Sequence, residues 1–188
     1  REDSVLDMQD DNGTLHIGMD FNLDPMSAVI CVRKGEKLYA IDEIVMFGSN
    51  TDEMVAEIIN RYPRRSIIIY PDPASRQRKT SAGGRTDLSI LQNAGFSVKA
   101  KNSHALIRDR INSVNSRLLS GNGSRHLFVS PKCKQTIKSL ERQTYKEGTS
   151  IANKDDGYDH MNDALGYLVE YLFPVRTEYA TPQPQRWT

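Results

Sequence analysis

The order of the apolar segments along the chain restricts the fold more than any other feature of the sequence. Three short runs with strand-like patterns, 15–21, 27–33 and 37–46, follow one another directly. Pro25 and Gly35 lie between them at a spacing typical of tight turns. Because no helical pattern separates the runs, they predict a three-stranded antiparallel meander.

Helical and strand patterns alternate after the meander. A helix is predicted to begin at Asn50 or Thr51 and to end before Pro63, and the run Ser66–Tyr70 predicts a short buried strand that Pro71 stops. The other expected elements are a helix at 87–94 capped by Thr86, strands at 96–100 and 126–129, and helices at 104–119, 131–145 and 159–172. This order predicts an α/β domain in which a mixed central sheet combines the meander with parallel strands, with helices on both faces.

The helix expected at 104–119 is amphipathic. Its buried side is predicted to carry six apolar residues, Leu106, Ile107, Ile111, Val114, Leu118 and Leu119. Arg108 and Arg110 are then expected on the solvated side, from which they could also reach phosphate groups.

Three aspartates stand at the ends of these elements. Asp20 ends the first strand run, Asp72 follows the strand at 66–70, and Asp163 lies near the start of the last helix. Each taken singly could be an ordinary turn or surface carboxylate. The order of elements resembles that of a ribonuclease H-like fold, in which the first and fourth strands are neighbours, so Asp20 and Asp72 are expected at one sheet end.

Carboxylates that converge on one point favour hard divalent cations such as Mg²⁺ or Mn²⁺. Two such ions can activate a water and stabilise the leaving oxygen of a phosphodiester. We therefore interpret Asp20, Asp72 and Asp163 as catalytic metal ligands, with Asp20 bridging both ions. Asp159, one helical turn before Asp163, is either a further metal ligand or the N-cap of the last helix. His160 could orient a phosphate or lie at the surface.

A basic segment, 73–86, directly follows Asp72 and predicts a mobile loop that contacts DNA. Its basic side chains are Arg76, Arg78, Lys79 and Arg85. The whole chain has 25 basic and 24 acidic residues and a net charge of +1, so no global field attracts nucleic acid and any binding depends on such a local patch. Gly83 and Gly84 are not followed by the Gly-Lys-Ser/Thr sequence of a P-loop.

The remaining composition narrows the class of protein. At 188 residues the chain fits one domain. Cys31 and Cys133 have no zinc-ligand spacing and are expected to be free thiols. No apolar run has membrane-spanning length and no signal segment is visible, so a soluble, intracellular protein without a membrane partner is expected.

Three segments carry a family resemblance: 18–22 (Gly-Met-Asp-Phe-Asn), 70–74 (Tyr-Pro-Asp-Pro-Ala) and 155–167 (Asp-Asp-Gly-Tyr-Asp-His-Met-Asn-Asp-Ala-Leu-Gly-Tyr). Together they resemble the C-terminal nuclease domain of the large terminase subunit of tailed bacteriophages, from about Leu15 to Phe173. The resemblance implies a ribonuclease H-like fold and an endonuclease that cuts concatemeric viral DNA during genome packaging, with two divalent cations, Mg²⁺ or Mn²⁺. The family's metal-binding acids then correspond to Asp20, Asp72 and Asp163, with Asp159 as an accessory ligand.

The resemblance also implies a domain organisation and partners. Residues 1–13 are expected to be the remnant of an interdomain linker, 14–174 the ribonuclease H-like nuclease domain, and 175–188 a flexible C-terminal tail. In full-length relatives an N-terminal ATPase domain precedes the nuclease in the same polypeptide. The implied partners are double-stranded DNA, the portal and the small terminase subunit, in the cytoplasm of the infected bacterial host.

Two other interpretations fit the same residues. Another ribonuclease H-like nuclease, such as a Holliday-junction resolvase, would share the acids and differ in its product. A non-catalytic module that docks the portal or the small terminase subunit would leave the acids as ordinary surface residues. A sugar-kinase or actin-like ATPase needs a glycine-rich hairpin after the first strand, and Phe21-Asn22-Leu23 supplies none.

Overall fold

The computed structural model describes residues 4–6, 12–22, 24–73, 85–103, 105–147, 149, 153 and 157–175. In this part of the chain the strands are β1 (Leu15–Asp20), β2 (Met26–Lys34), β3 (Lys37–Met46), β4 (Ile67–Pro71), β5 (Ser97–Val98) and β6 (Leu127–Val129). The helices are α1 (Thr51–Arg61), α2 (Asp87–Asn93), α3 (Ile107–Leu118), α4 (Lys134–Arg142) and α5 (Asp159–Leu172).

The strands form one mixed sheet in the order β5-β4-β1-β2-β3-β6. β1, β2 and β3 pair antiparallel, which confirms the predicted meander. β4 pairs with β1 in parallel, β5 pairs with β4 in parallel, and β6 pairs with β3 in parallel. The first and fourth strands are therefore neighbours, as the order of segments predicted.

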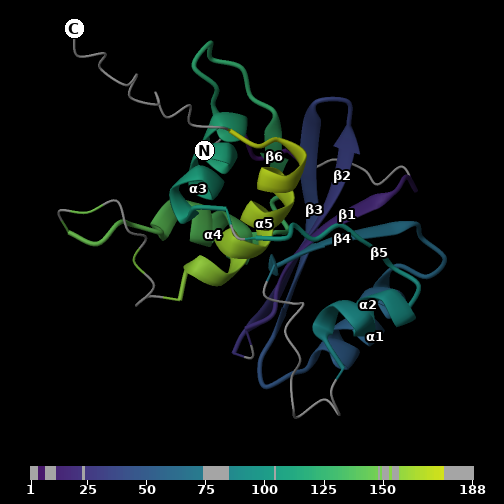
Figure 1. Ribbon diagram of the computed structural model, residues 1–188. Helices are drawn as coiled ribbons and strands as arrows, with labels where there is room; N and C mark the ends of the chain where they lie inside the picture. Colours follow the sequence, from purple (N-terminus) through teal and green to yellow (C-terminus); the bar gives the residue numbers. More distant parts are fainter. Residues whose placement is uncertain are drawn as a thin grey trace, which may run out of the picture.

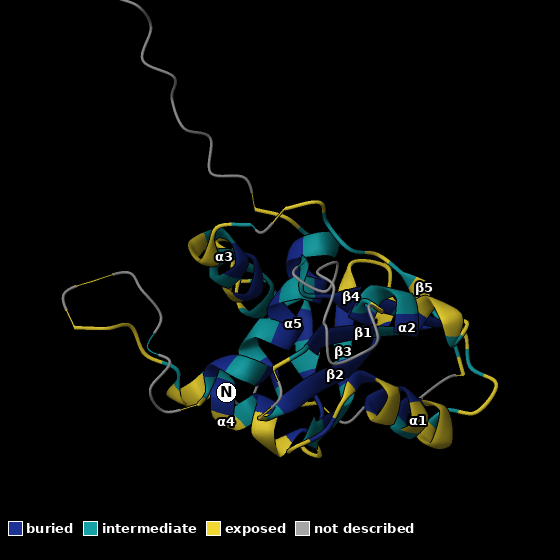
Figure 2. Cartoon of the chain, turned by 60° about the horizontal axis from the view of Figure 1, so that its bottom comes forward, coloured by how far each residue is buried: buried dark blue, intermediate teal, exposed yellow. Residues whose placement is uncertain are grey.

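Helices cover both faces of the sheet (Figure 1). α1 and α2 lie on one face, and α5 crosses the other face over β1, β2 and β4. α3 and α4 pack against α5 rather than mainly against the strands, so they form an outer layer on that side. The central strands are buried between the two helical layers, and exposed residues lie on the outer sides of the helices (Figure 2). The predicted α/β architecture is confirmed.

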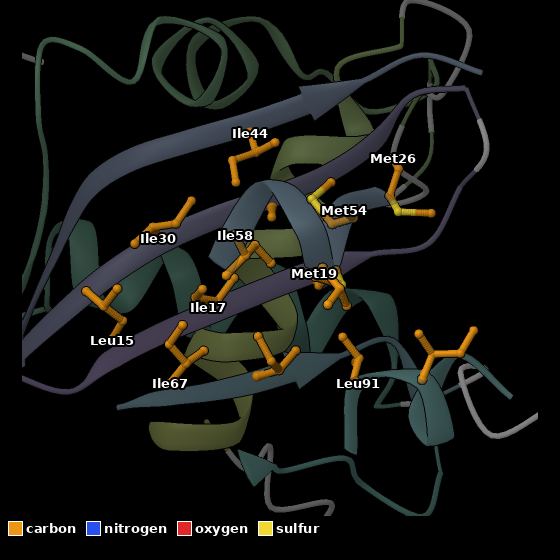
Figure 3. Packing of buried hydrophobic residues seen from close by; sticks show 14 of the residues in the cluster. Leu15, Ile17, Met19, Met26, Ile30, Ile44, Met54, Ile58, Ile67 and Leu91 are labelled. Carbon is orange, nitrogen blue, oxygen red and sulfur yellow. The ribbon is translucent and has the colours of Figure 1, made fainter. Parts of the chain in front are cut away.

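The alternation of side chains along β1 separates two cores. Leu15, Ile17 and Met19 are fully buried on the face that α1 covers, where they meet Met54 and Ile58 (Figure 3). Each such side chain contributes about 1.5–3 kcal/mol when it leaves water. The intervening residues His16, Gly18 and Asp20 point to the face that α5 covers. β1 thus directs its only carboxylate toward α5.

The helix starts agree with the sequence where capping chemistry determines them. The Asn50 side chain accepts the backbone N–H of Glu53, whose own carboxylate accepts the N–H of Asn50. Thr86 and Ser89 form the same reciprocal pair at the start of α2. These capping boxes satisfy backbone donors that the helix itself leaves unpaired.

The predicted buried stripe of α3 is confirmed only for Val114 and, in part, for Leu118, which packs against the same core cluster. Leu106 and Leu119 are 56% and 53% exposed, and Val114 is the one residue of the expected set that is buried. Arg110 and Ser113, both polar, are buried instead. The reason lies in the partner surface, because α3 packs on α5, where buried polar groups find partners that an amphipathic pattern cannot show.

The segment before β1 contacts the far edge of the sheet. Val5 forms an isolated parallel bridge with Val129, and the Leu6 N–H donates to the Val129 carbonyl over 3.1 Å. The rest of the expected linker, residues 1–3 and 7–11, and the expected tail after Val175 lie outside the described residues. The proposed domain limits stay predictions.

Both cysteines are buried free thiols. Burial is the main cause that raises the pKa of Cys133 to about 12. Within the described residues, none of the helices has the length and apolar character needed to cross a membrane.

Candidate active site

A glycine sets how closely α5 approaches the sheet. A Cβ on Gly18 would lie 2.1 Å from the backbone carbonyl oxygen of Ala164, far inside any real contact. α5 therefore rests directly on the backbone of β1. Asp20 lies two residues after Gly18 on the same face, and Asp163 lies one residue before Ala164. The close approach brings the two carboxylates to the same end of the sheet.

Asp20 is almost completely buried, with 2% of its surface exposed. The side-chain amide of Asn22 donates to Asp20 Oδ2 over 2.7 Å, and His160 Nδ1 lies 3.2 Å from the same oxygen. Burial, together with the nearby Asp163 carboxylate, raises the pKa of Asp20 to about 6, although Asn22 and His160 act in the opposite direction. A buried acid close to a second acid is a pattern found at functional sites.

Asp72 reaches the same region through the parallel pairing of β4 with β1. Met19 is paired with Pro71, and the Asp72 N–H donates to the Met19 carbonyl over 3.1 Å. Asp72 therefore comes beside Asp20, which confirms the expectation that these two residues are neighbours at one sheet end.

Asp163 is held by an arginine from another helix. Arg110 of α3 donates from Nη2 to Asp163 Oδ1 over 2.5 Å, and the two side chains are only 7% and 13% exposed. The Arg110 guanidinium also lies 4.6 Å from the centre of the Tyr167 ring. The expectation that Arg110 belongs to a solvated face is therefore wrong.

The charges of all three aspartates affect the pKa of the Tyr167 hydroxyl. Burial is the largest cause that raises the pKa of Tyr167, and Arg110 opposes it. Asp163, Asp72 and Asp20 each raise that pKa further through their charges. The three carboxylates, from β1, the end of β4 and α5, thus all lie near enough to Tyr167 to influence its pKa.

Asp159 and His160 extend this region along the first turn of α5. The N-cap of α5 is Tyr158, which makes no side-chain capping bond, so the interpretation of Asp159 as the N-cap is wrong. Asp159 is instead the first helical residue and is 4% exposed. His160 Nε2 lies 3.9 Å from Asp159 Oδ1, so the imidazole lies between Asp159 and Asp20 rather than at a free surface.

Of the four basic residues predicted to bind DNA, Arg85 is among the residues that the structure describes. Arg85 forms an exposed ion pair with Asp52 of α1, with 3.1 Å between Nη2 and Oδ2. Arg76, Arg78 and Lys79 lie outside the described residues. Lys99 and Lys101, which no sequence pattern indicated, line a small pocket together with Pro71 and Pro73 beside Asp72. They follow β5, which has only two residues, and a strand this short has no sequence periodicity that would indicate on which side of the sheet they lie.

The chemistry of the donor set suits divalent cations. The three aspartates offer oxygen ligands from three different elements, which is what Mg²⁺ and Mn²⁺ prefer. Within the residues that the structure describes, however, no three acidic, histidine or cysteine side chains form a ready-made metal cage. Cation binding at this point would draw the carboxylates together against their mutual repulsion.

A protein-family model matches residues 17–172, which is most of the chain. The family is described as the terminase RNaseH-like domain. This chain belongs to that family. The matched residues include Asp20, Asp72 and Asp163, so all three candidate acids lie within the family's domain.

Solved structures of large terminases have the same fold as this terminase RNaseH-like domain. The large terminase of a thermophilic bacteriophage matches with a TM-score of 0.71 and 18% identity, over 92% of this chain and 44% of that chain. The P22 large terminase nuclease domain matches with a TM-score of 0.70 and 13% identity, over 93% of this chain and 91% of that one. The SPP1 large terminase nuclease domain, crystallised with bound Mn, matches with a TM-score of 0.56 and 15% identity, over 85% of this chain and 87% of that one.

The comparisons confirm the ribonuclease H-like fold. This chain spans less than half the length of the thermophilic-phage terminase that it matches. No curated protein matches the chain significantly.

Proposed function

We propose that this domain is a metal-dependent endodeoxyribonuclease that cuts concatemeric viral DNA during genome packaging. The observation that supports this function best is the placement of Asp20, Asp72 and Asp163 at one end of the sheet of a terminase RNaseH-like domain, which the pairing of β4 with β1 and the contact of Gly18 with Ala164 bring about. The manganese bound by the SPP1 nuclease domain also supports a dependence on divalent cations.

Each aspartate has a distinct role in this proposal. Asp20 would contact both of two Mg²⁺ or Mn²⁺ ions, Asp72 and Asp163 would each hold one of them, and Asp159 would be an accessory ligand. When bound, the two ions supply the activation of a water and the stabilisation of the leaving oxygen. Asn22 and His160 hold the Asp20 carboxylate in place by contacting one oxygen. Although the pKa of Asp20 is raised to about 6, the carboxylate is still largely ionised at neutral pH, so a bound cation would displace little proton.

The substrate in this proposal is the backbone of double-stranded DNA. Arg76, Arg78, Lys79 and Arg85 follow Asp72 in the sequence and would contact phosphates next to the cleaved bond. The chain has no recognisable base-reading motif, so cleavage should show little sequence preference.

The proposed biological setting follows the family. An N-terminal ATPase domain in the same polypeptide would move the DNA, and the portal and the small terminase subunit would be further partners, in the cytoplasm of the infected host. The thermophilic-phage large terminase, of which this chain spans 44%, supports a longer parent protein.

Incubating supercoiled plasmid with the purified domain tests the activity. Nicking and linearisation are expected with Mn²⁺ or Mg²⁺, and none with excess EDTA. Undiminished cleavage in EDTA would refute the metal-dependent mechanism. Cleavage of four-way junctions without cleavage of duplex would favour a resolvase. A docking module would be favoured if the domain cleaves no DNA and if calorimetry detects no Mn²⁺ binding that is lost in Asp20→Asn.

A further inference from the structure

Arg110 is a buried cation in a region otherwise crowded with carboxylates. It is 6% exposed, and its guanidinium contacts Asp163 and Tyr167, both on α5. A buried arginine is costly unless its charge is paired, so its position demands an explanation. The ion pair with Asp163 and the ring of Tyr167 provide the compensation.

We propose that Arg110 is a positioning residue for Asp163. Its guanidinium holds Asp163 Oδ1 and so fixes the orientation of the carboxylate that would bind a divalent cation. This inference rests on the proposed nuclease function. Ligating carboxylates are commonly oriented by a second hydrogen-bonding group in this way, because a ligand that cannot rotate loses less entropy when the ion binds.

The surface of α5 is shaped to receive this side chain. Asp163, Gly166 and Tyr167 are three and four residues apart, so they share one face of the helix. A Cβ at Gly166 would lie 2.7 Å from Arg110 Cγ and 2.8 Å from Cδ. The stem of Arg110 therefore occupies the space that a side chain at 166 would need, and its guanidinium continues to Asp163 and over Tyr167.

Direct contact with DNA does not explain the geometry equally well. An arginine that binds a phosphate has to present its donors to solvent, whereas the Arg110 side chain is 7% exposed and already has an ion-pair partner. The two roles differ in kinetics. Loss of a phosphate contact raises KM for DNA, whereas loss of carboxylate orientation lowers kcat and weakens cation binding.

Steady-state cleavage by the whole domain tests the proposal with three variants and a control. Arg110→Gln should lower kcat by about 10–100-fold with KM for DNA nearly unchanged, and should raise the Mn²⁺ concentration needed for half-maximal rate. Gly166→Ala should do the same, because its Cβ displaces the Arg110 stem. Arg110→Lys should recover part of the rate, since an ammonium can still donate one hydrogen bond to Oδ1.

Arg117→Gln is the matched control. Arg117 is on the same helix, lies 3.6 Å from the centre of the Phe173 ring and pairs with the Glu36 carboxylate over 3.3 Å. Like Arg110, it pairs with a carboxylate and lies over an aromatic ring, but it does not contact a proposed cation ligand. The control should lose thermal stability while keeping kcat and the Mn²⁺ dependence of the parent.

A double-mutant cycle on the metal-free protein provides a readout that does not depend on activity. Arg110→Gln should lower Tm clearly in the parent and much less in an Asp163→Asn background, because the unpaired buried carboxylate is then absent. Arg117→Gln should lower Tm equally in both backgrounds. Additive effects of Arg110→Gln and Asp163→Asn would overturn the proposal.

Two further outcomes would also overturn it. If Arg110→Gln raises KM and leaves kcat and the Mn²⁺ dependence unchanged, Arg110 contacts DNA. If it lowers only Tm, its role is structural. Failure of the nuclease function itself would look different, because the parent domain would then cleave no DNA while the Tm cycle would still report the coupling.

Discussion

The backbone of Gly18 in β1 contacts the backbone of Ala164 in α5, so closely that a Cβ on Gly18 would lie 2.1 Å from the Ala164 carbonyl oxygen. The obstacle is a helix backbone, which cannot rotate aside as a side chain can. Asp20 and Asp163 are the near neighbours of these two residues in the sequence. The spacing of the candidate catalytic acids therefore depends on a position that has no functional group.

Gly18→Ala should displace α5 from β1. We expect a loss of at least about 1–3 kcal/mol in the free energy of unfolding, which is the usual cost of overpacking, and a fall of about a hundredfold in cleavage, because small misplacements of catalytic groups are that costly. Thermal unfolding and plasmid cleavage measure the two effects. Gly121→Ala is the control, since nothing lies within 4 Å of its Cβ position. Parental activity in Gly18→Ala would contradict the positioning role of this contact.

Neutralising a candidate ligand should stop the reaction without unfolding the domain. Asp20→Asn, Asp72→Asn and Asp163→Asn are each expected to lower the cleavage rate by orders of magnitude. The free energy of unfolding of metal-free Asp20→Asn should stay equal or rise, because the variant removes a charge that burial and Asp163 disfavour. Asp42→Asn is the control, because Asp42 is bound to Tyr62 and Arg61 on the α1 side. Parental cleavage by Asp20→Asn or Asp163→Asn would place the site elsewhere.

The stability of the metal-free domain should depend on pH through Asp20. Its pKa rises from 3.8 in the unfolded reference to about 6 in the fold, so the native state binds more protons between these values. Stability contributed by the protonated acid is complete below pH 3.8 and is lost as the pH rises through 6, by about 3 kcal/mol for a shift of this size. Chemical denaturation in EDTA across this range measures it. Asp20→Asn should lack this component, and an identical pH profile in the variant would refute it.

Asp159→Asn separates a ligand from a helix-stabilising residue. Asp159 is buried at the first position of α5 and faces His160, so we expect cleavage to fall while the fold is kept. Loss of the favourable interaction with the helix dipole should cost only about 0.3–1 kcal/mol. Cleavage and Tm are to be compared with those of the parent. Full activity with a lowered Tm would show that Asp159 only stabilises the helix start.

The basic segment after Asp72 should act on substrate capture. Arg76→Gln together with Arg78→Gln is expected to raise KM for DNA and to reduce the salt dependence of binding by about one unit of slope per lost phosphate contact. Calorimetric Mn²⁺ binding should stay unchanged. Lys34→Gln with Lys37→Gln, in the turn at the opposite end of the sheet from Asp20, is the control. An unchanged KM in the first pair would show that these arginines do not contact DNA.

Local patterns were enough to predict most of the strands and helices. The meander, the short β4 stopped by Pro71 and the capping boxes at Asn50 and Thr86 depend on turn residues, apolar periodicity and neighbours three residues away. Asp20 and Asp72 could be expected together because the ribonuclease H-like arrangement that the element order resembles has the first and fourth strands side by side. All of these depend on interactions between residues close in sequence or on a topology with few alternatives.

Apolar periodicity did not correctly predict which residues at α3 are buried. Leu106 and Leu119, which flank α3 and were expected on its buried side, are exposed, while Arg110 is buried. Periodicity assumes that a helix buries its apolar side, but here the opposing surface of α5 offers a carboxylate at Asp163 and an open space at Gly166. A residue 53 positions away determines whether the arginine is buried. No local pattern contains that information.

The sequence by itself therefore determined the α/β fold class, the family and the three candidate acids. Only the tertiary structure decided how those acids are held: Asn22 and His160 on Asp20, Arg110 on Asp163, and the contact of Gly18 with Ala164 that sets their spacing. The physical reason is that secondary structure depends on short-range backbone preferences, whereas the charge state and orientation of a buried carboxylate depend on whichever distant side chains share its low-dielectric surroundings.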